Sequence, residues 1–516
     1  MQELRKTADR FRQGNYIRLF LINFIFMLAV YFSMYSNGLV NQWDGIWEYN
    51  YYKAGRWSIS LGRWLWPFLD RIKMGLGTEP LSTISACALF ALGITIAFFF
   101  IYDQKKASGK AWVYAFLFLG SASVCVSLSY RYMSATYGFA FLFSILAVFC
   151  LAEIKKPVPA VIAAGFLIAA QMGLYQAYIG CTGLLIVVWL LAQLAKEKST
   201  FKQFGALIGR TVCAVILGGG LYLVGLKVCL RFSHTAPASY KGMADYSILN
   251  TILNLGRSSV NAYRVFTRFF FSTDYRTNLF MNYSALYYTL AAVIAVALLI
   301  NMCLFLVKLF KQNIVKGILG TALFLLSPVA VNAVLLIATD TETAIQMTVA
   351  LALYLPVMFC FFDSSNRSED ALSKKNVWKI AGCAEICLVV IFLYGMVLQI
   401  QVDQEAMRTG ILCVTNMAEV ITEDLNSSGY LDGSKPICAV GVPSGNKLYS
   451  FPKACEGANY YAIFGSWGTW SDWNSWKGVF QHLIGLDIEY AEKEQSNQIR
   501  GNSELEKMPC FPEEGY

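Results

Sequence analysis

The chain has 516 residues, of which 56% are hydrophobic and 15% are charged, and its mean hydropathy is +0.48. A water-soluble protein of this size needs more polar surface, and a disordered chain needs far fewer apolar residues. An outer-membrane barrel is also excluded, because its strands alternate in polarity, whereas this sequence stays apolar for about twenty residues at a time. In a membrane protein the formal charge of +9 reflects basic residues that set the orientation in the membrane and attract anionic lipids. We expect no nucleic acid among the partners. The composition predicts a polytopic α-helical membrane protein.

The apolar stretches predict about eleven transmembrane helices. The first covers residues 19–35, follows a basic N-terminus and has no small-residue cleavage site after it, so we expect it to remain uncleaved. The stretch from residue 158 to residue 194 could form one bent helix or a helical hairpin. The other stretches cover residues 81–101, 111–129, 136–151, 204–230, 285–307, 314–338, 344–362 and 378–400.

Charged residues in the loops predict the orientation. Every second loop is rich in Lys or Arg, which the positive-inside rule assigns to the cytoplasm. We therefore expect a multi-pass protein of the plasma membrane, with the N-terminus in the cytoplasm and the C-terminus outside. Two long outer loops, residues 37–80 and 231–284, are also basic and contain many aromatic residues. They predict interfacial helices with snorkelling cations, or a site for a phosphate head group.

The composition becomes polar after residue 400. The sequence thus predicts two domains, a transmembrane domain over residues 1–400 and a small extracytoplasmic α/β domain over residues 401–516. Short runs at Ile437–Val442 and Tyr460–Phe464 are typical of strands. Four tryptophans at positions 467, 470, 473 and 476 could form a core or stack on sugars.

The first outer loop contains the densest set of reactive side chains. Asp44 and Glu48 are four residues apart, so they share one face if the segment is helical. Aromatic residues surround them, and Arg56 and Arg63 follow. Sugar transfer needs a carboxylate to accept a proton, flat apolar surfaces for the ring and cations for a departing phosphate. The same residues would also suit an interfacial aromatic belt with solvated charges.

Several short motifs favour a sugar-transfer site over an aromatic belt. Asp44, Gly62-Arg63-Trp64, Ser129-Tyr-Arg-Tyr, Gly173-Leu-Tyr-Gln-Ala and Ser327-Pro occur in this order. Together they resemble the type II O-antigen glucosyltransferases, the GtrII-like family of GT-C class membrane enzymes, over roughly residues 15–400. The loop at residues 338–344 departs from the family pattern, because it is acidic and lacks a cation.

The resemblance implies a glycosyltransferase with a GT-C-like fold. It would move a hexose, glucose in particular, from a polyprenyl-phosphate donor to a cell-surface glycan on the outer face of the membrane. The candidate site residues are Asp44 and Glu48 for catalysis, Arg56, Arg63 and Arg131 for the donor phosphate, and Trp43, Trp47, Trp64, Tyr175 and Gln176 for the sugar or acceptor.

No cofactor and no metal site is expected, because cations can stabilise a lipid phosphate leaving group and no His/Cys cluster has metal spacing. The alternative function is a polytopic transporter or a flippase for lipid-linked sugar. Such a protein should have ionisable residues in the middle of the membrane, where this sequence has few.

Overall fold

The computed structural model describes residues 2–41, 44–49, 51–197, 199–238, 248–271, 285–337, 343–367, 376–438, 455, 457–464, 472–486, 489–500 and 502. Across these ranges the chain is helical and forms no strand, only isolated bridges between Tyr51 and Leu76 and between Ile437 and Tyr490. The longer helices are α1 (Gln2–Gln13), α2 (Tyr16–Val30), α7 (Leu81–Ile101), α8 (Ala111–Leu119), α9 (Ala122–Ser129), α10 (Ser134–Glu153), α11 (Pro157–Leu174), α12 (Ile179–Ala195), α13 (Phe201–Ser233), α15 (Leu255–Phe271), α16 (Ala285–Gln312), α17 (Ile314–Val331), α19 (Val349–Arg367), α20 (Asn376–Ser427) and α22 (Lys493–Arg500).

Short helices fill the connections. They are α3 (Phe32–Ser36), α4 (Asp44–Trp47), α5 (Arg56–Ser60), α6 (Trp66–Ile72), η1 (Gln176–Tyr178), α14 (Ile248–Leu253), α18 (Val334–Ile337), η3 (Ile345–Met347), η5 (Tyr460–Ala462), α21 (Asp472–Gly478) and the π-helical turn η7 (Val479–Ile484). Both long predicted outer loops therefore contain helices, and their position at the membrane surface stays a prediction.

The helices match the apolar stretches of the sequence. In the described part of the chain, eight helices are long and apolar enough to cross a membrane, and two bent pairs, α1 with α2 and α8 with α9, raise the number to ten. The apolar part of α19 is shorter than a full span. The prediction of a polytopic helical membrane protein is confirmed, and the count of eleven stays a prediction. Residues 158–194 form two helices, α11 and α12, joined by η1.

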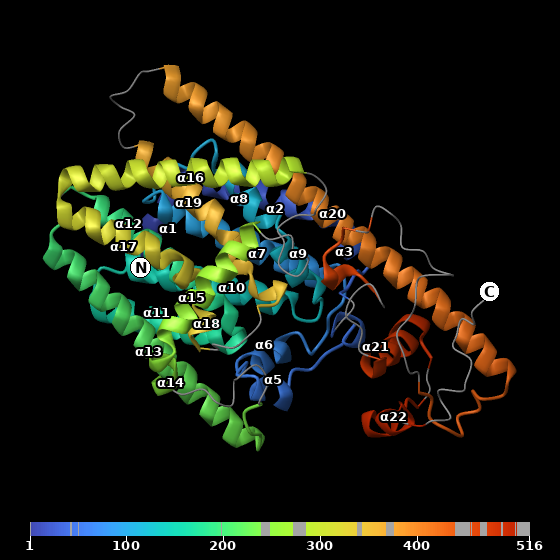
Figure 1. Ribbon diagram of the computed structural model, residues 1–516. Helices are drawn as coiled ribbons and strands as arrows, with labels where there is room; N and C mark the ends of the chain where they lie inside the picture. Colours follow the sequence, from blue (N-terminus) through green and yellow to red (C-terminus); the bar gives the residue numbers. More distant parts are fainter. Residues whose placement is uncertain are drawn as a thin grey trace.

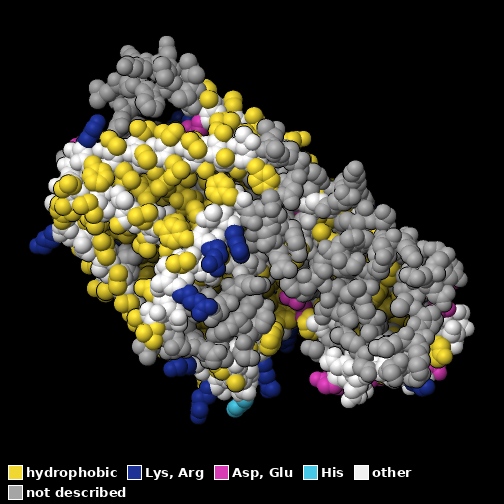
Figure 2. Space-filling model, viewed as in Figure 1, with side chains coloured by type: hydrophobic (Ala, Val, Ile, Leu, Met, Phe, Trp, Pro, Cys, Tyr) yellow, Lys and Arg dark blue, Asp and Glu magenta, His cyan; other side chains and the backbone are white. Residues whose placement is uncertain are grey.

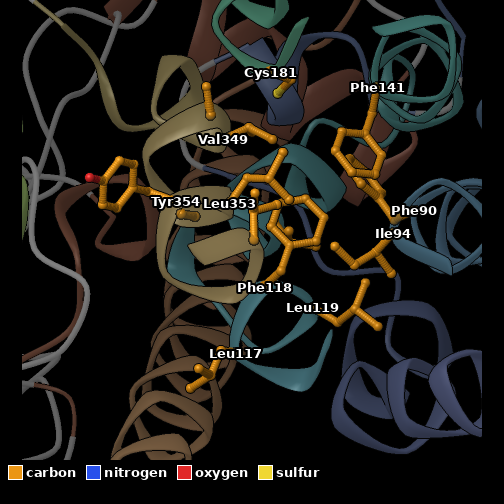
Figure 3. Packing of buried hydrophobic residues seen from close by; sticks show 14 of the residues in the cluster. Phe90, Ile94, Leu117, Phe118, Leu119, Phe141, Cys181, Val349, Leu353 and Tyr354 are labelled. Atoms are coloured by element: carbon orange, nitrogen blue, oxygen red, sulfur yellow. The ribbon is translucent and has the colours of Figure 1, made fainter. Parts of the chain in front are cut away.

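Burial separates the inner helices from the outer ones. Aromatic rings of α7, α8 and α10 meet at the centre, where Phe118 lies 4.8 Å from Phe141 and Phe90 lies 5.4 Å from Phe141 (Figure 3). Helices α13 and α16 instead leave most of their apolar side chains uncovered, and Figure 2 shows such side chains gathered over α16 and α17. Hydrocarbon is the solvent that suits this surface.

Glycines permit close helix packing in the centre of the bundle. A Cβ atom at Gly180 would lie 2.1 Å from the carbonyl oxygen of Val331, and one at Gly183 would lie 2.5 Å from that of Ala330. Helices α12 and α17 therefore approach each other along a surface of small residues, as is common between membrane helices. Gly180 lies just after η1, the short turn that leads into α12, so the contact also holds this end of the helix.

Helix α20 extends far beyond the bundle and runs along the side of the molecule toward α21 (Figure 1). Its buried positions recur every three or four residues, so one face stays covered along most of its length. These positions are Val389, Phe392, Met396, Ile400, Asp403, Met407, Val414 and Met417. The predicted boundary between residues 400 and 401 falls inside this unbroken helix, and the division into two domains stays a prediction.

The expected strand at Tyr460–Phe464 is wrong. Residues Tyr460–Ala462 form the 3₁₀ turn η5, and both tyrosines are buried, whereas consecutive side chains of a strand point to opposite faces. The Tyr461 hydroxyl donates a 2.6 Å hydrogen bond to the buried Asp403 of α20. Most of the run after Ile437 lies outside the described residues, so the α/β character of the C-terminal part is not confirmed.

Candidate active site

The two predicted carboxylates lie on one short helical turn. Asp44 begins α4, and the backbone N–H of Glu48 donates to the Asp44 carbonyl over 2.9 Å. Asn41 caps the turn, because its side-chain oxygen accepts from the N–H of Gly45 over 3.2 Å. The Asn41 side-chain and backbone N–H groups both donate to the Ser129 carbonyl, each over 3.1 Å. The start of α4 is thereby fixed to the end of α9.

The surroundings of Asp44 and Glu48 shift the pKa values of the two carboxyl groups to different extents. Burial and, to a smaller extent, the nearby negative charge of Asp44 together raise the pKa of Glu48 to about 8. Burial also raises the pKa of Asp44, but the positive charge of Arg63 opposes that change. The Asp44 side chain remains accessible to solvent although protein surrounds it. At neutral pH Glu48 therefore keeps its proton, while the positive charge of Arg63 favours the ionised form of Asp44.

We expect this difference to appear in the stability of the protein. The folded protein holds the Glu48 proton more tightly than the unfolded chain, so the free energy of unfolding should fall as pH rises from about 4.5 to about 8 and then level off. Glu48→Gln cannot ionise, so its melting temperature should fall less over the same range. Thermal unfolding of the detergent-solubilised protein at a series of pH values measures this. Glu419→Gln, which removes an exposed carboxylate of α20, should follow the wild type.

Arg63 lies among aromatic rings. Its guanidinium carbon is 4.7 Å from the centre of the Tyr175 ring and 6.0 Å from that of Trp66. Its Nε is buried and has no hydrogen-bond partner, and no ion pair joins Arg63 to a described residue. A buried guanidinium N–H group without a hydrogen-bond partner is costly, so its presence points to a ligand that accepts from it, such as a phosphate.

The aromatic rings around Arg63 come from four parts of the chain. Tyr137 of α10 lies 4.9 Å from Tyr175, edge to face. Tyr52 lies 5.1 Å from Trp66 and 5.0 Å from Tyr132. Tyr52, Trp66 and Tyr137 are not among the predicted site residues. The aromatic content of the outer loops was the available signal for Tyr52 and Trp66, whereas Tyr137 lies inside an apolar stretch.

Arg131 has a different environment from Arg63. It is 4% exposed, and its donors are directed at backbone carbonyls, that of Tyr49 over 2.9 Å and that of Gly38 over 3.3 Å. Its guanidinium carbon lies 3.9 Å from the centre of the Tyr49 ring. Gly38 has a φ of +59°, and a Cβ atom there would lie 2.9 Å from Arg131 Nη1. Arg131 therefore holds the chain on both sides of α4, and its predicted contact with phosphate stays a prediction.

The other predicted residues are spread over the site and its surroundings. Arg56 begins α5 with an exposed side chain, and no hydrogen bond or ring contact of the described residues joins it to Arg63. Trp64 packs against α11 and α13, where a Cβ atom at Gly173 or Gly225 would lie within 2.9 Å of its ring. Gln176 donates to the Leu61 carbonyl over 2.8 Å.

The two remaining tryptophans belong to the segment around α4. Trp47 ends α4, and its carbonyl contacts His482 of the C-terminal segment at 3.0 Å. Trp43 lies outside the described residues. Asp44, Glu48, Arg63 and Tyr175 are thus the predicted residues that the structure gathers in one place. His482 gave no signal in the sequence, because nothing relates it to a loop more than four hundred residues away.

A family model described as glucosyl transferase GtrII matches residues 39–361, which is more than half of the chain. The matched region begins just before α4 and contains Asp44, Glu48, Arg63, Arg131 and Tyr175. It excludes α20 and the C-terminal segment. No curated protein and no solved structure matches the chain. The match agrees with the resemblance carried by the motifs and favours an enzyme over a transporter. The chain belongs to the GtrII glucosyl transferase family and is a membrane glucosyltransferase.

Proposed function

We propose that the protein transfers glucose from a polyprenyl-phosphate donor to a cell-surface glycan on the outer face of the membrane. The observation that carries this proposal is Arg63, whose buried Nε has no hydrogen-bond partner among the described residues, beside Asp44 and a protonated Glu48. A lipid phosphate would supply an acceptor for this N–H group and a negative charge for the guanidinium. The rings of Tyr175 and Trp66 would give the sugar flat surfaces on either side of that charge.

The reaction forms one bond and breaks one. The hydroxyl oxygen of the acceptor attacks the anomeric carbon, and Asp44 accepts the hydroxyl proton. The bond between the anomeric carbon and the phosphate oxygen breaks, and the polyprenyl phosphate departs with the electron pair. Arg63 stabilises the charge that develops on this oxygen. Glu48, protonated at neutral pH, donates a hydrogen bond to the acceptor or to Asp44.

The two ends of the helical bundle differ in a way that supports an outer site. At one end lie the Lys-rich loops, where Lys196 pairs with Asp103 at 3.7 Å and Lys316 donates to the Lys196 carbonyl over 2.9 Å. The segment around the acidic turn is bonded elsewhere, through Asn41 to Ser129 at the end of α9 and through the Leu65 N–H to the Gly173 carbonyl near the end of α11. Helix α12, which ends at Ala195 beside Lys196, begins close to that end of α11. The positive-inside rule assigns the first end to the cytoplasm.

The test is a transfer assay with the purified full-length protein in liposomes. Donors are radiolabelled glucosyl polyprenyl phosphate and, in a separate reaction, radiolabelled UDP-glucose, each with a membrane-impermeant glycan acceptor. We expect label in the glycan from the lipid donor only, and only when the glycan is on the side opposite Lys105. Cysteine labelling at position 105 reports that orientation. Transfer from UDP-glucose alone, or on the Lys105 side, would contradict the proposal.

A further inference from the structure

The turn that carries Asp44 and Glu48 is too short to be stable by itself, since a single helical turn is marginal in isolation. Its start is held by Asn41 on Ser129, and the chain after it is held by Arg131 on Tyr49. Both of these contacts come from the region that matches the family. A third contact comes from the C-terminal segment 472–486, which lies outside that region.

His482 makes this third contact. Its Nε2 lies 3.0 Å from the carbonyl oxygen of Trp47, the last residue of α4. Its ring stacks on that of Tyr49, with centres 6.4 Å apart. Burial lowers the pKa of His482, the hydrogen bond with Trp47 opposes this, and the charges of Arg131 and Lys477 add to the lowering, so the neutral ring is favoured. The carbonyl accepts, so the proton must reside on Nε2.

Close packing keeps His482 in place. A Cβ atom at Gly478 would lie 2.7 Å from the Ile46 carbonyl oxygen, so α21 and η7 touch the backbone of α4 directly. Ile46 is fully buried in one cluster with Trp476, Val479 and Phe480. Trp476 thus contributes to a core, which is one of the two roles considered for the tryptophan row. The π-helical form of η7 is rare and is found most often at functional sites.

We infer that His482 is a positioning residue of the transfer reaction, which fixes the backbone on both sides of Glu48 through Trp47 and Tyr49. The site is then built from two parts of the chain. The family region supplies the reacting groups, and the C-terminal segment holds the turn on which they lie. The effect on transfer rests on the proposed function, whereas the effect on the turn itself does not.

The experiment compares His482→Ala, His482→Phe and His482→Gln in the full-length protein. Hydrogen exchange of a peptide that contains residues 44–49 reports the turn, because the Glu48 N–H is bonded to the Asp44 carbonyl. Without the His482 hydrogen bond, as in the Ala and Phe variants, exchange should be about fivefold faster. His482→Gln retains an N–H donor and should restore most of the protection. The transfer rate at saturating donor should fall about tenfold or more in the first two variants and recover in the third.

Gln481→Ala is the matched control, since it changes the neighbouring residue of η7, which makes no hydrogen bond to α4 within the described part of the chain. It should leave both readouts as in the wild type. Unchanged exchange of residues 44–49 in His482→Ala, or equal effects in Gln481→Ala, would overturn the inference. If His482→Ala unfolds and exchange rises throughout the protein, the test becomes the comparison of His482→Phe with His482→Gln. Equal exchange of residues 44–49 in these two variants would then overturn the inference. A wild type without transfer from the lipid donor would contradict the proposed function and leave the exchange result valid.

Discussion

Asp44→Asn should abolish most of the transfer activity while the protein still folds. Asparagine has the size of aspartate and retains hydrogen bonding, but it cannot accept a proton from the attacking hydroxyl. General base catalysis contributes roughly 10² to 10⁴-fold, and we expect a loss of that order in the rate at saturating donor. Because Asp44 is exposed to solvent at the start of α4, the melting temperature should change little. The measurement is initial transfer rate and thermal unfolding on the same preparation.

Glu48→Gln is the control for this result. Glu48 carries its proton at neutral pH, and an amide can replace a protonated carboxyl as a hydrogen-bond donor, so most activity should remain. If Glu48→Gln is inactive and Asp44→Asn is active, the two roles are reversed. If both variants transfer glucose as the wild type does, the reacting carboxylate is not on α4.

Arg63→Met should remove transfer without lowering stability. Methionine matches the length of the arginine stem, so the contacts with Tyr175 and Trp66 remain apolar, while the charge that stabilises the leaving phosphate is lost. Removal of one stabilising group from a transition state costs roughly 10² to 10³-fold in rate. The melting temperature of the ligand-free protein should stay the same or rise, because the buried Nε of Arg63 has no hydrogen-bond partner in the described part of the chain.

Arg71→Met provides the comparison for an arginine of the same loop. Arg71 is exposed on α6 and stacks on Phe68 at 5.4 Å, away from the candidate residues, so transfer should persist. Arg63→Lys should recover only part of the activity, since an ammonium lacks the planar set of donors that matches phosphate. A fully active Arg63→Met would show that Arg63 is an interface anchor.

The sequence predicts the parts of this structure that depend on local properties. Long apolar runs identify the helices, because hydrocarbon accepts no unpaired backbone polar groups. Asp44, Glu48 and Arg63 could be grouped because one loop carries them all. Tyr137 and His482 could not, since the first lies in an apolar helix and the second is brought to α4 only by the packing of α20 and α21.

Arg131 illustrates a different limit. The position of an arginine in a short outer loop suggests a functional cation. It does not reveal whether the guanidinium donors are free for phosphate or are bonded to backbone carbonyls. Only the positive φ of Gly38 and the path of the chain after α4 direct those donors to the Gly38 and Tyr49 carbonyls. The tyrosines of Tyr460–Phe464 are similar, because these strand-forming residues have no neighbouring strand in the described part of the chain and form a 3₁₀ turn beside Asp403 instead.

The unbroken course of α20 imposes a constraint on length. Each residue of an α-helix advances the chain by about 1.5 Å and turns it by about 100°. One residue inserted between Ile400 and Gly410 would therefore rotate Val414 and Met417 away from Ile46 and the C-terminal segment. A seven-residue insertion would restore the rotation but displace the covering face by about 10 Å along the axis. Helical phase and length in this stretch thus set the alignment of the C-terminal segment with the catalytic turn, and we expect insertions to be tolerated only beyond Ser427.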